Sequence, residues 1–194
     1  MADWKSWKRT FDDLNAMYSE SGRHYHTLNH VRDCLEKAKL GKGIATDLDA
    51  VEAALWFHDA FYDTRRHDNE GRSAALARER LVRAGVGRAF AENVERMILF
   101  TVHTDRPTDV DAQLVVDIDL SSLGSAREVF ARNTESIWRE YEGVTDIGTF
   151  RRERAGVLQS FLDRDPIYLT RPFRDRYEKL ARDNLRRSID ELRE

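Results

Sequence analysis

Apolar side chains recur at intervals of three and four residues along most of this chain. Trp7, Phe11, Leu14 and Tyr18 show this spacing first, and later segments repeat it. Such spacing places the apolar side chains on one face of an α-helix. With only 10 Gly and 3 Pro in 194 residues, few positions interrupt the pattern. The sequence therefore predicts an all-α protein, a single-domain helical bundle of about eight or nine helices over residues 1–194.

Gly, Pro and polar turns separate the periodic segments and set the expected helix boundaries. One segment is ambiguous, because its apolar run Gln-Leu-Val-Val-Asp-Ile would also suit a buried strand. The helices are expected over about residues 4–19, 28–41, 47–59, 69–85, 87–101, 110–123 (the ambiguous segment), 128–142, 150–162 and 174–192.

Composition narrows the classes of partner. The net charge is −3, and basic and acidic residues are interleaved, so no basic field predicts a nucleic-acid partner. No apolar run approaches the ~20 residues that cross a bilayer, so no membrane partner is expected. The N-terminus has no apolar signal core, which favours a cytoplasmic location. The single cysteine, Cys34, excludes an intramolecular disulfide and a cysteine-based zinc cluster, and its apolar neighbours predict a buried, inert thiol.

Two polar residues, His58 and Asp59, interrupt the apolar stretch Ala-Ala-Leu-Trp-Phe-His-Asp-Ala-Phe-Tyr-Asp. A buried carboxylate is costly unless it is paired or binds a metal. This pair therefore predicts a cation. We expect the remaining ligands on other helices, because helical bundles build metal sites from facing helices.

The candidate co-ligands are His30 and an aspartate of the segment Val-Val-Asp-Ile-Asp-Leu-Ser-Ser-Leu-Gly. His30 begins the apolar side of the second expected helix. On a helix, Asp119 shares the apolar face, whereas Asp117 points away from it, so Asp119 is the expected ligand. On a strand both aspartates would share a face, and the choice between them would stay open.

The order of these residues resembles the HD superfamily of metal-dependent phosphohydrolases, in an uncharacterised bacterial branch. The motif has a histidine, then a His-Asp pair, then a distant aspartate, and His30, His58, Asp59 and Asp119 match its positions. The likeness covers about residues 20–125, and helices in residues 126–194 would complete the bundle. The resemblance implies a divalent-metal-dependent phosphohydrolase that acts on a small phosphorylated metabolite, most plausibly a nucleotide.

Two imidazoles and two carboxylates suit one divalent ion, either Mn, Fe, Co, Ni, Zn or Mg, and a second ion is left open. Asp63, one helical turn beyond Asp59 if the helix continues, is expected to activate water, and Glu70 is a second candidate. His103 could donate to phosphate, act as the leaving-group acid or bind a second metal. Arg23 is expected to bind the substrate phosphate.

Three histidines receive no ligand role. His26 is expected to support the site without binding the metal directly, and His24 and His67 are expected to be exposed to solvent.

Two alternatives remain open. In the superfamily's alarmone hydrolases, an acidic pair Glu-Asp follows the His-Asp motif, and here Tyr62 stands where that Glu would be, so an alarmone pyrophosphohydrolase fits less well. A non-catalytic module that binds metal or a nucleotide for regulation is the other alternative. The aromatic first and last helices could support a homodimer.

Overall fold

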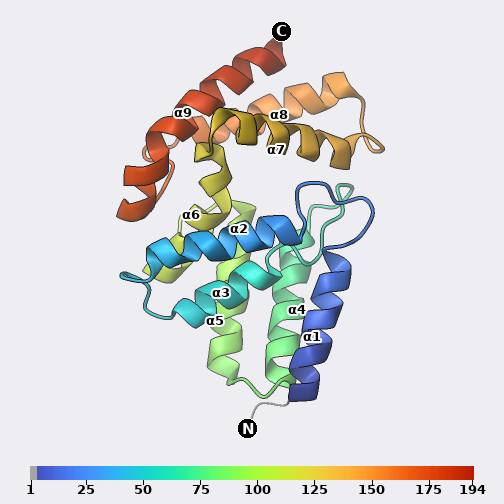
Figure 1. The fold of residues 1–194 in the computed structure, drawn as a ribbon, viewed down its shortest axis with the longest axis vertical. Helices are drawn as coiled ribbons and strands as arrows, with labels where there is room; N and C mark the ends of the chain where they lie inside the picture. Colours follow the sequence, from blue (N-terminus) through green and yellow to red (C-terminus); the bar gives the residue numbers. More distant parts are fainter. Residues whose placement is uncertain (1–3) are drawn as a thin grey trace. The chain divides into compact units, whose positions relative to one another are not determined.

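The computed structural model describes residues 4–194, and side chains from Ser6 onward. Within this range the regular structure consists of nine α-helices and three short 3₁₀ helices, without a strand, which confirms the predicted all-α class (Figure 1). The segment that also suited a strand is helical. The α-helices are α1 (Trp4–Met17), α2 (Leu28–Ala38), α3 (Leu48–Phe57), α4 (Asn69–Arg83), α5 (Arg88–Leu99), α6 (Val110–Leu120), α7 (Arg127–Tyr141), α8 (Ile147–Leu162) and α9 (Arg171–Arg193).

The chain divides into two compact units, Met1–Asp119 and Leu120–Glu194. None of the described helices is both long enough and apolar enough to cross a membrane.

Helix α3 forms the centre of the first unit. Its residues Ala50, Val51, Ala54 and Leu55 have no exposed surface, and α2, α4 and α5 all contact this helix. Burial on several sides follows from its sequence, which is apolar around most of its circumference. Side chains that project from this helix therefore enter the interior of the unit.

Side-chain contacts define the N-terminal end of α3. Its N-cap residue Asp47 accepts a hydrogen bond from the backbone N–H of Ala50, and the carboxylate of Asp111 accepts the backbone N–H groups of Thr46 and Asp47. Helix α3 ends at Phe57, so His58 is its C-cap residue. The prediction that the helix continues through the His58–Asp59 pair is therefore wrong by two residues.

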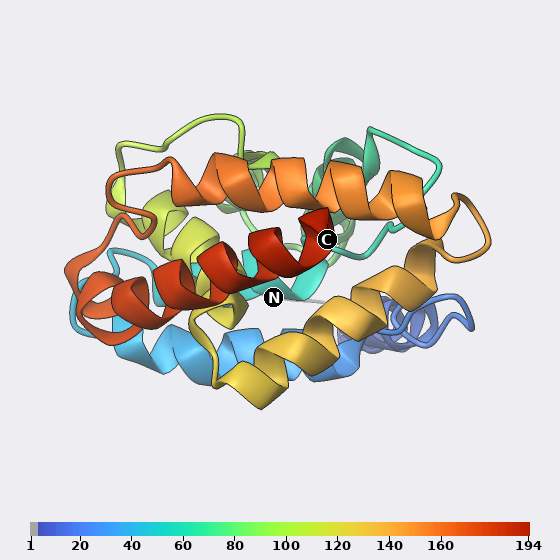
Figure 2. The ribbon, with the colours of Figure 1, turned by 90° about the horizontal axis from the view of Figure 1, so that it is seen from above.

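The second unit contains α7, α8 and α9. Figure 2 shows α9 running between α7 and α8. Aromatic contacts join α7 to α8, and the ring centroids of Trp138 and Phe150 are 4.9 Å apart. The hydroxyl of Tyr168 donates to the carbonyl oxygen of Leu120 at 3.1 Å. A Cβ atom at Gly124 would lie 2.8 Å from the backbone oxygen of Tyr177, so only glycine permits this approach of η3 (Ser121–Gly124) to α9.

Candidate metal centre

The position of His58 at the end of α3 fixes the chemistry of its ring. Its Nδ1 lies 2.9 Å from the backbone oxygen of Leu55. A carbonyl oxygen can only accept, so Nδ1 carries the hydrogen and donates it. In the neutral ring Nε2 is then unprotonated, and its lone pair points away from α3. A backbone carbonyl that holds the other ring nitrogen is the usual support of a metal-binding histidine.

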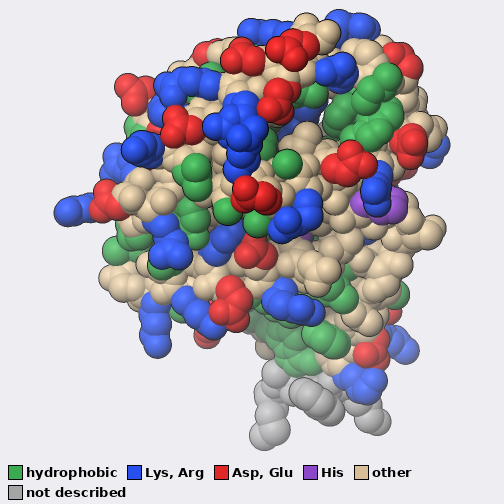
Figure 3. All heavy atoms as spheres, turned by 45° about the horizontal axis from the view of Figure 1, so that its top comes forward, with side chains coloured by type: hydrophobic (Ala, Val, Ile, Leu, Met, Phe, Trp, Pro, Cys, Tyr) green, Lys and Arg blue, Asp and Glu red, His purple; other side chains and the backbone are tan. Residues whose placement is uncertain are grey.

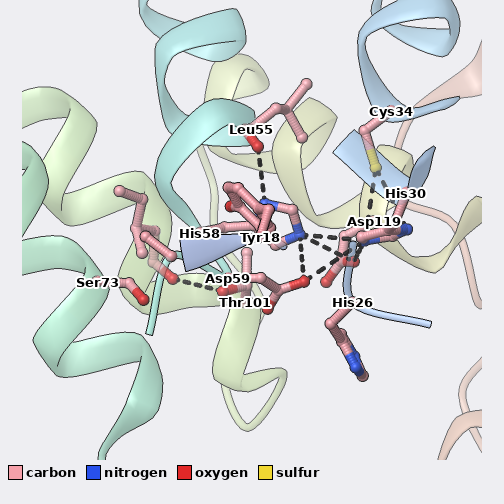
Figure 4. A network of polar contacts seen from close by, with 12 residues as sticks. Tyr18, His26, His30, Cys34, Leu55, His58, Asp59, Ser73, Thr101 and Asp119 are labelled. Carbon is pink, nitrogen blue, oxygen red and sulfur yellow. Dashed lines mark hydrogen bonds and ion pairs between the residues drawn. The ribbon is translucent and has the colours of Figure 1, made fainter. Parts of the chain in front are cut away.

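Three further polar atoms surround Nε2 of His58 (Figure 4). Oδ2 of Asp59 lies 3.0 Å away, Nε2 of His30 lies 3.2 Å away, and Oδ1 of Asp119 lies 3.5 Å away. His30 Nε2 is itself 3.6 Å from Oδ2 of Asp59 and 3.3 Å from Oδ1 of Asp119. Side chains from α2, from the end of α3 and from α6 thus converge on one small volume within the first unit.

These separations fit a coordinated cation. Ligand atoms about 2.1 Å from a metal are separated by about 3.0 Å in an octahedral arrangement and about 3.4 Å in a tetrahedral one. The five measured separations lie between 3.0 and 3.6 Å. Oδ2 of Asp59 is moreover buried and accepts no hydrogen bond of adequate geometry. A lone pair of His58 thus faces a buried carboxylate oxygen, and a proton or a metal ion must lie between them.

A thiol lies beside the same histidines. Sγ of Cys34 is 3.7 Å from Nε2 of His30, and ligand atoms of His30, Cys34 and His58 all lie within 4.8 Å of one another. This buried group could hold a metal ion. Burial raises the pKa of the Cys34 thiol, so it remains protonated at neutral pH. Its burial agrees with the prediction. Its place beside His30 follows from the spacing of four residues on α2, whereas its approach to His58 depends on how α2 packs against α3.

The charges of the cluster shift one another's titration. Burial acts to lower the pKa of His58, but the charges of Asp59 and Asp119 and the contacts with their carboxylates together outweigh it, and the pKa of His58 is raised. Burial acts to raise the pKa of Asp59 and of Asp119. For Asp59 the charges of His58 and His26 and the contact with His58 together overcome burial, and for Asp119 the contacts with His103, His30 and His58 do so, so the pKa of both carboxyls is lowered.

In the metal-free protein, stability should fall as the pH rises above 6.5 toward the raised pKa of His58. The folded state holds this proton more tightly than the unfolded chain, so its contribution is fully present below 6.5 and is lost as the pH passes the folded pKa. The two carboxyls act in the opposite sense: their contribution is present above 3.8 and is lost as the pH falls through their lowered pKa values.

Urea unfolding in chelator across a pH series measures this dependence. The double variant Asp59→Asn, Asp119→Asn removes the charges that raise the pKa of His58, so its stability should change less above pH 6.5 than that of the wild type. An unchanged slope in the double variant would show that other groups cause the dependence.

Of the two candidate aspartates of α6, Asp119 faces the cluster. Its Oδ1 lies near His30 and His58, and its Oδ2 lies 2.8 Å from Nε2 of His103. Asp117 is fully buried within the unit. His103 has the left-handed backbone conformation, with φ 62°, and directly follows η2 (Phe100–Val102). His103 therefore orients Asp119, in addition to any role toward a substrate.

The phosphate-binding role expected for Arg23 does not fit the structure. Its guanidinium is buried and donates to three backbone oxygens, those of His26 at 3.2 Å, Asp59 at 2.6 Å and Ala60 at 2.7 Å. Its Nε faces the carboxylate of Glu20 at 3.3 Å. Arg23 therefore fixes the backbone that carries the His58–Asp59 pair, and these contacts occupy most of the guanidinium donors that a phosphate would need.

The two acids expected near the site differ in their positions. Asp63 lies in the loop after α3, where its carboxylate accepts the backbone N–H of Arg65 at 3.0 Å, so the assumed helical turn between Asp59 and Asp63 is absent. Glu70 lies in the first turn of α4. Burial raises its pKa, and the charges of Asp59 and Asp119 raise it further. Glu70 therefore belongs to the electrostatic environment of the cluster.

The remaining histidines agree with the predictions in part. His24 and His67 are exposed, as expected. The ring of His26 stacks on Tyr62 with centroids 3.9 Å apart. In Figure 4 His26 lies outside the network of dashed contacts. Tyr62, the residue that departs from the alarmone-hydrolase pattern, thus packs against a histidine next to the cluster.

Comparison with protein-family models, with curated proteins and with solved structures finds no match to this chain in any of the three. The geometry and chemistry of the cluster are therefore what bear on function.

Proposed function

We propose that this protein is a divalent-metal-dependent phosphohydrolase of the HD type that acts on a small phosphorylated metabolite, most plausibly a nucleotide. The observation that carries the proposal is the convergence of two imidazole nitrogens and two carboxylate oxygens at 3.0 to 3.6 Å in the sequence order of the HD motif. Mixed nitrogen and oxygen ligands suit Mn, Fe, Co, Ni or Zn and are tolerable for Mg.

His30, His58, Asp59 and Asp119 would hold the ion. When bound, a divalent metal lowers the pKa of a water molecule and offsets charge that develops on a phosphoryl group. The chain's own groups then have separate tasks. Glu70 is the best-supported proton acceptor for the attacking water, because its raised pKa brings it closer to neutral pH. His103 holds Asp119 in position and is the candidate acid for the leaving group.

One observation favours the second candidate function, a metal-binding module without turnover. Two cations near the cluster in sequence are engaged elsewhere: Arg23 binds backbone oxygens, and Arg66 pairs with Asp68 at 2.7 Å. A phosphate would then depend on the metal, on His103 or on groups outside this set. Turnover assays separate the two functions.

The test is a panel of nucleoside mono- and triphosphates, alarmones and sugar phosphates, assayed with Mn²⁺, Co²⁺ and Mg²⁺. We expect release of phosphate or pyrophosphate from at least one nucleotide and a loss of kcat/KM of about 1000-fold in Asp59→Asn. Glu70→Gln should lower kcat by a larger factor than the factor by which it raises the Kd for the metal. Asp68→Asn, a nearby exposed carboxylate, serves as the matched control and should leave the rate unchanged.

Each pattern of results distinguishes the proposals. Turnover of alarmones alone would favour the alarmone pyrophosphohydrolase. Metal-dependent thermal stabilisation by a nucleotide without turnover of any compound would favour the binding module and contradict hydrolysis. Turnover that survives in Asp59→Asn would show that the cluster is not the catalytic centre.

A further inference from the structure

The first unit contains a cavity of about 450 Å³ between α1 and α3. Each helix lines it with one stripe of side chains that are three or four residues apart, from Trp7 to Leu14 on α1 and from Asp49 to Trp56 on α3. Each stripe includes one small residue, Thr10 or Ala53, so the larger side chains around them leave a hollow. Its volume is within the range of small-molecule sites, which are mostly apolar with a few placed polar groups.

Three large aromatic side chains line this cavity. The ring of Phe11 meets that of Trp56 edge to face, with centroids 5.6 Å apart. Phe11 is 54% exposed, and Trp7 and Trp56 are half-buried, whereas Phe57 and Leu81 close the base of the cavity and are buried. Leaving so much aromatic surface in water costs free energy, and apolar surface gathered at a hollow is typical of a binding site.

The two charged residues that line the cavity, Asp49 and Glu52, are both acidic. Neither carboxylate forms an ion pair or a hydrogen bond within the part of the chain that the structure describes, whereas Asp13 on α1 pairs with Arg80 at 2.8 Å. Asp49 lies in the first turn of α3, where a negative charge favours the helix N-terminus, but Glu52 lies one turn further along. Figure 3 shows basic and acidic side chains intermixed over the visible surface. An aromatic cavity whose charged lining is only acidic therefore indicates a cationic ligand.

We propose that this cavity binds a small organic cation, an ammonium compound with an apolar body. The face of an aromatic ring carries partial negative charge and attracts a cation, so the ammonium group would lie against Trp56 and face the carboxylates of Asp49 and Glu52. The apolar body would contact the buried base of the cavity. None of the four proposed metal ligands lines the cavity, so this site is separate from the candidate metal centre.

The experiment uses the full chain and three probes. Benzyltrimethylammonium has both the charge and an aromatic body, tetramethylammonium lacks the ring, and benzyl alcohol lacks the charge. Calorimetry should show that benzyltrimethylammonium binds at least about tenfold more tightly than either other probe, a difference of about 1.4 kcal/mol. Raised salt should weaken this binding. Benzyltrimethylammonium should also change the tryptophan fluorescence, and Trp56→Phe should reduce that change.

The double variant Asp49→Asn, Glu52→Gln should weaken the binding of benzyltrimethylammonium at least about tenfold, because it removes the negative charge of the cavity. Asp33→Asn, Glu36→Gln is the matched control, because these two acids are also three residues apart on a helix but are exposed, paired with lysines and outside the cavity. In a separate variant, Ala53→Leu should fill the hollow and abolish binding. Circular dichroism verifies that each variant is helical.

Several outcomes would overturn the proposal. They are equal affinity of the acidic double variant and its control, binding of benzyl alcohol as tight as that of benzyltrimethylammonium, and no binding of any probe at millimolar concentration. A dimer that dissociates in Ala53→Leu, without binding of benzyltrimethylammonium, would assign the cavity to a second copy of the chain and would also overturn it. None of these outcomes bears on the metal centre, which the activity panel tests.

Discussion

Asp59→Asn should lower the affinity for Mn²⁺, Co²⁺ or Zn²⁺ at least about 100-fold, because it removes the carboxylate that we propose as a direct ligand, and even an indirect partner is worth 10- to 100-fold. Oδ2 of Asp59 is a buried atom without a hydrogen bond, 3.0 Å from Nε2 of His58. The amide has nearly the same shape, so the loss reports the charge and the ligand oxygen rather than a cavity. Equilibrium dialysis after chelation and reloading should give about one ion per wild-type chain and none for the variant.

The matched control for this loss is Asp68→Asn. Asp68 is exposed, lies in the loop after the pair and contacts Arg66. The substitution removes the same charge as Asp59→Asn, and the Asp68→Asn variant should retain the full affinity for metal. Circular dichroism verifies that both variants are helical. Equal, low metal content in the wild type and Asp59→Asn after reloading would contradict the existence of the site.

Arg23→Met should destabilise the protein by roughly 3 kcal/mol, because buried hydrogen bonds from a charged group are worth about 1.5–3 kcal/mol and several are lost together. The guanidinium donates to backbone oxygens of Asp59 and Ala60 at 2.6 and 2.7 Å, and its Cζ lies 5.2 Å from the ring centroid of Tyr18. Methionine keeps the apolar stem but leaves those oxygens unsatisfied. The free energy of urea unfolding, measured in chelator, reports the loss.

Arg23→Lys should restore little of that stability, because an ammonium cannot reproduce the fixed fork of the guanidinium. Arg65→Met, an exposed arginine in the loop after the pair, should change the unfolding free energy by less than about 0.5 kcal/mol. Two results together would contradict the structural role: Arg23→Met unfolds at the same urea concentration as the wild type, and its KM for a phosphorylated substrate is raised. The phosphate-binding role expected from the sequence would then be correct.

The two variants separate two roles that lie side by side. Asp59 contributes a carboxylate oxygen to the cluster, whereas Arg23 fixes the backbone that presents it. The loss in Asp59→Asn should therefore appear in metal affinity with the fold retained. Arg23→Met should lower mainly the free energy of unfolding. It should lower the affinity for metal only to the extent that the backbone of Asp59 and Ala60 is displaced.

The sequence by itself determined the helices and the ordered candidate ligands. Periodic apolar residues are a local property of the chain, so the all-α class and most helix bounds follow directly from them. The choice of Asp119 over Asp117 also followed from helical geometry, and the structure brings Asp119 beside His30 and His58. The polar pair within an apolar stretch marked the region in which the polar cluster lies, because buried charge requires a partner.

Only the tertiary structure decided how α3 ends and what Arg23 does. No Gly or Pro marks the end of α3 at Phe57, and the arginine that binds the Asp59 carbonyl is 36 residues away in sequence. The same applies to Asp63, which lost its expected helical register once α3 ended early, and to Glu70, which lies near the cluster through packing. Contacts between distant segments depend on how the helices pack, and the spacing within each segment contains no record of that packing.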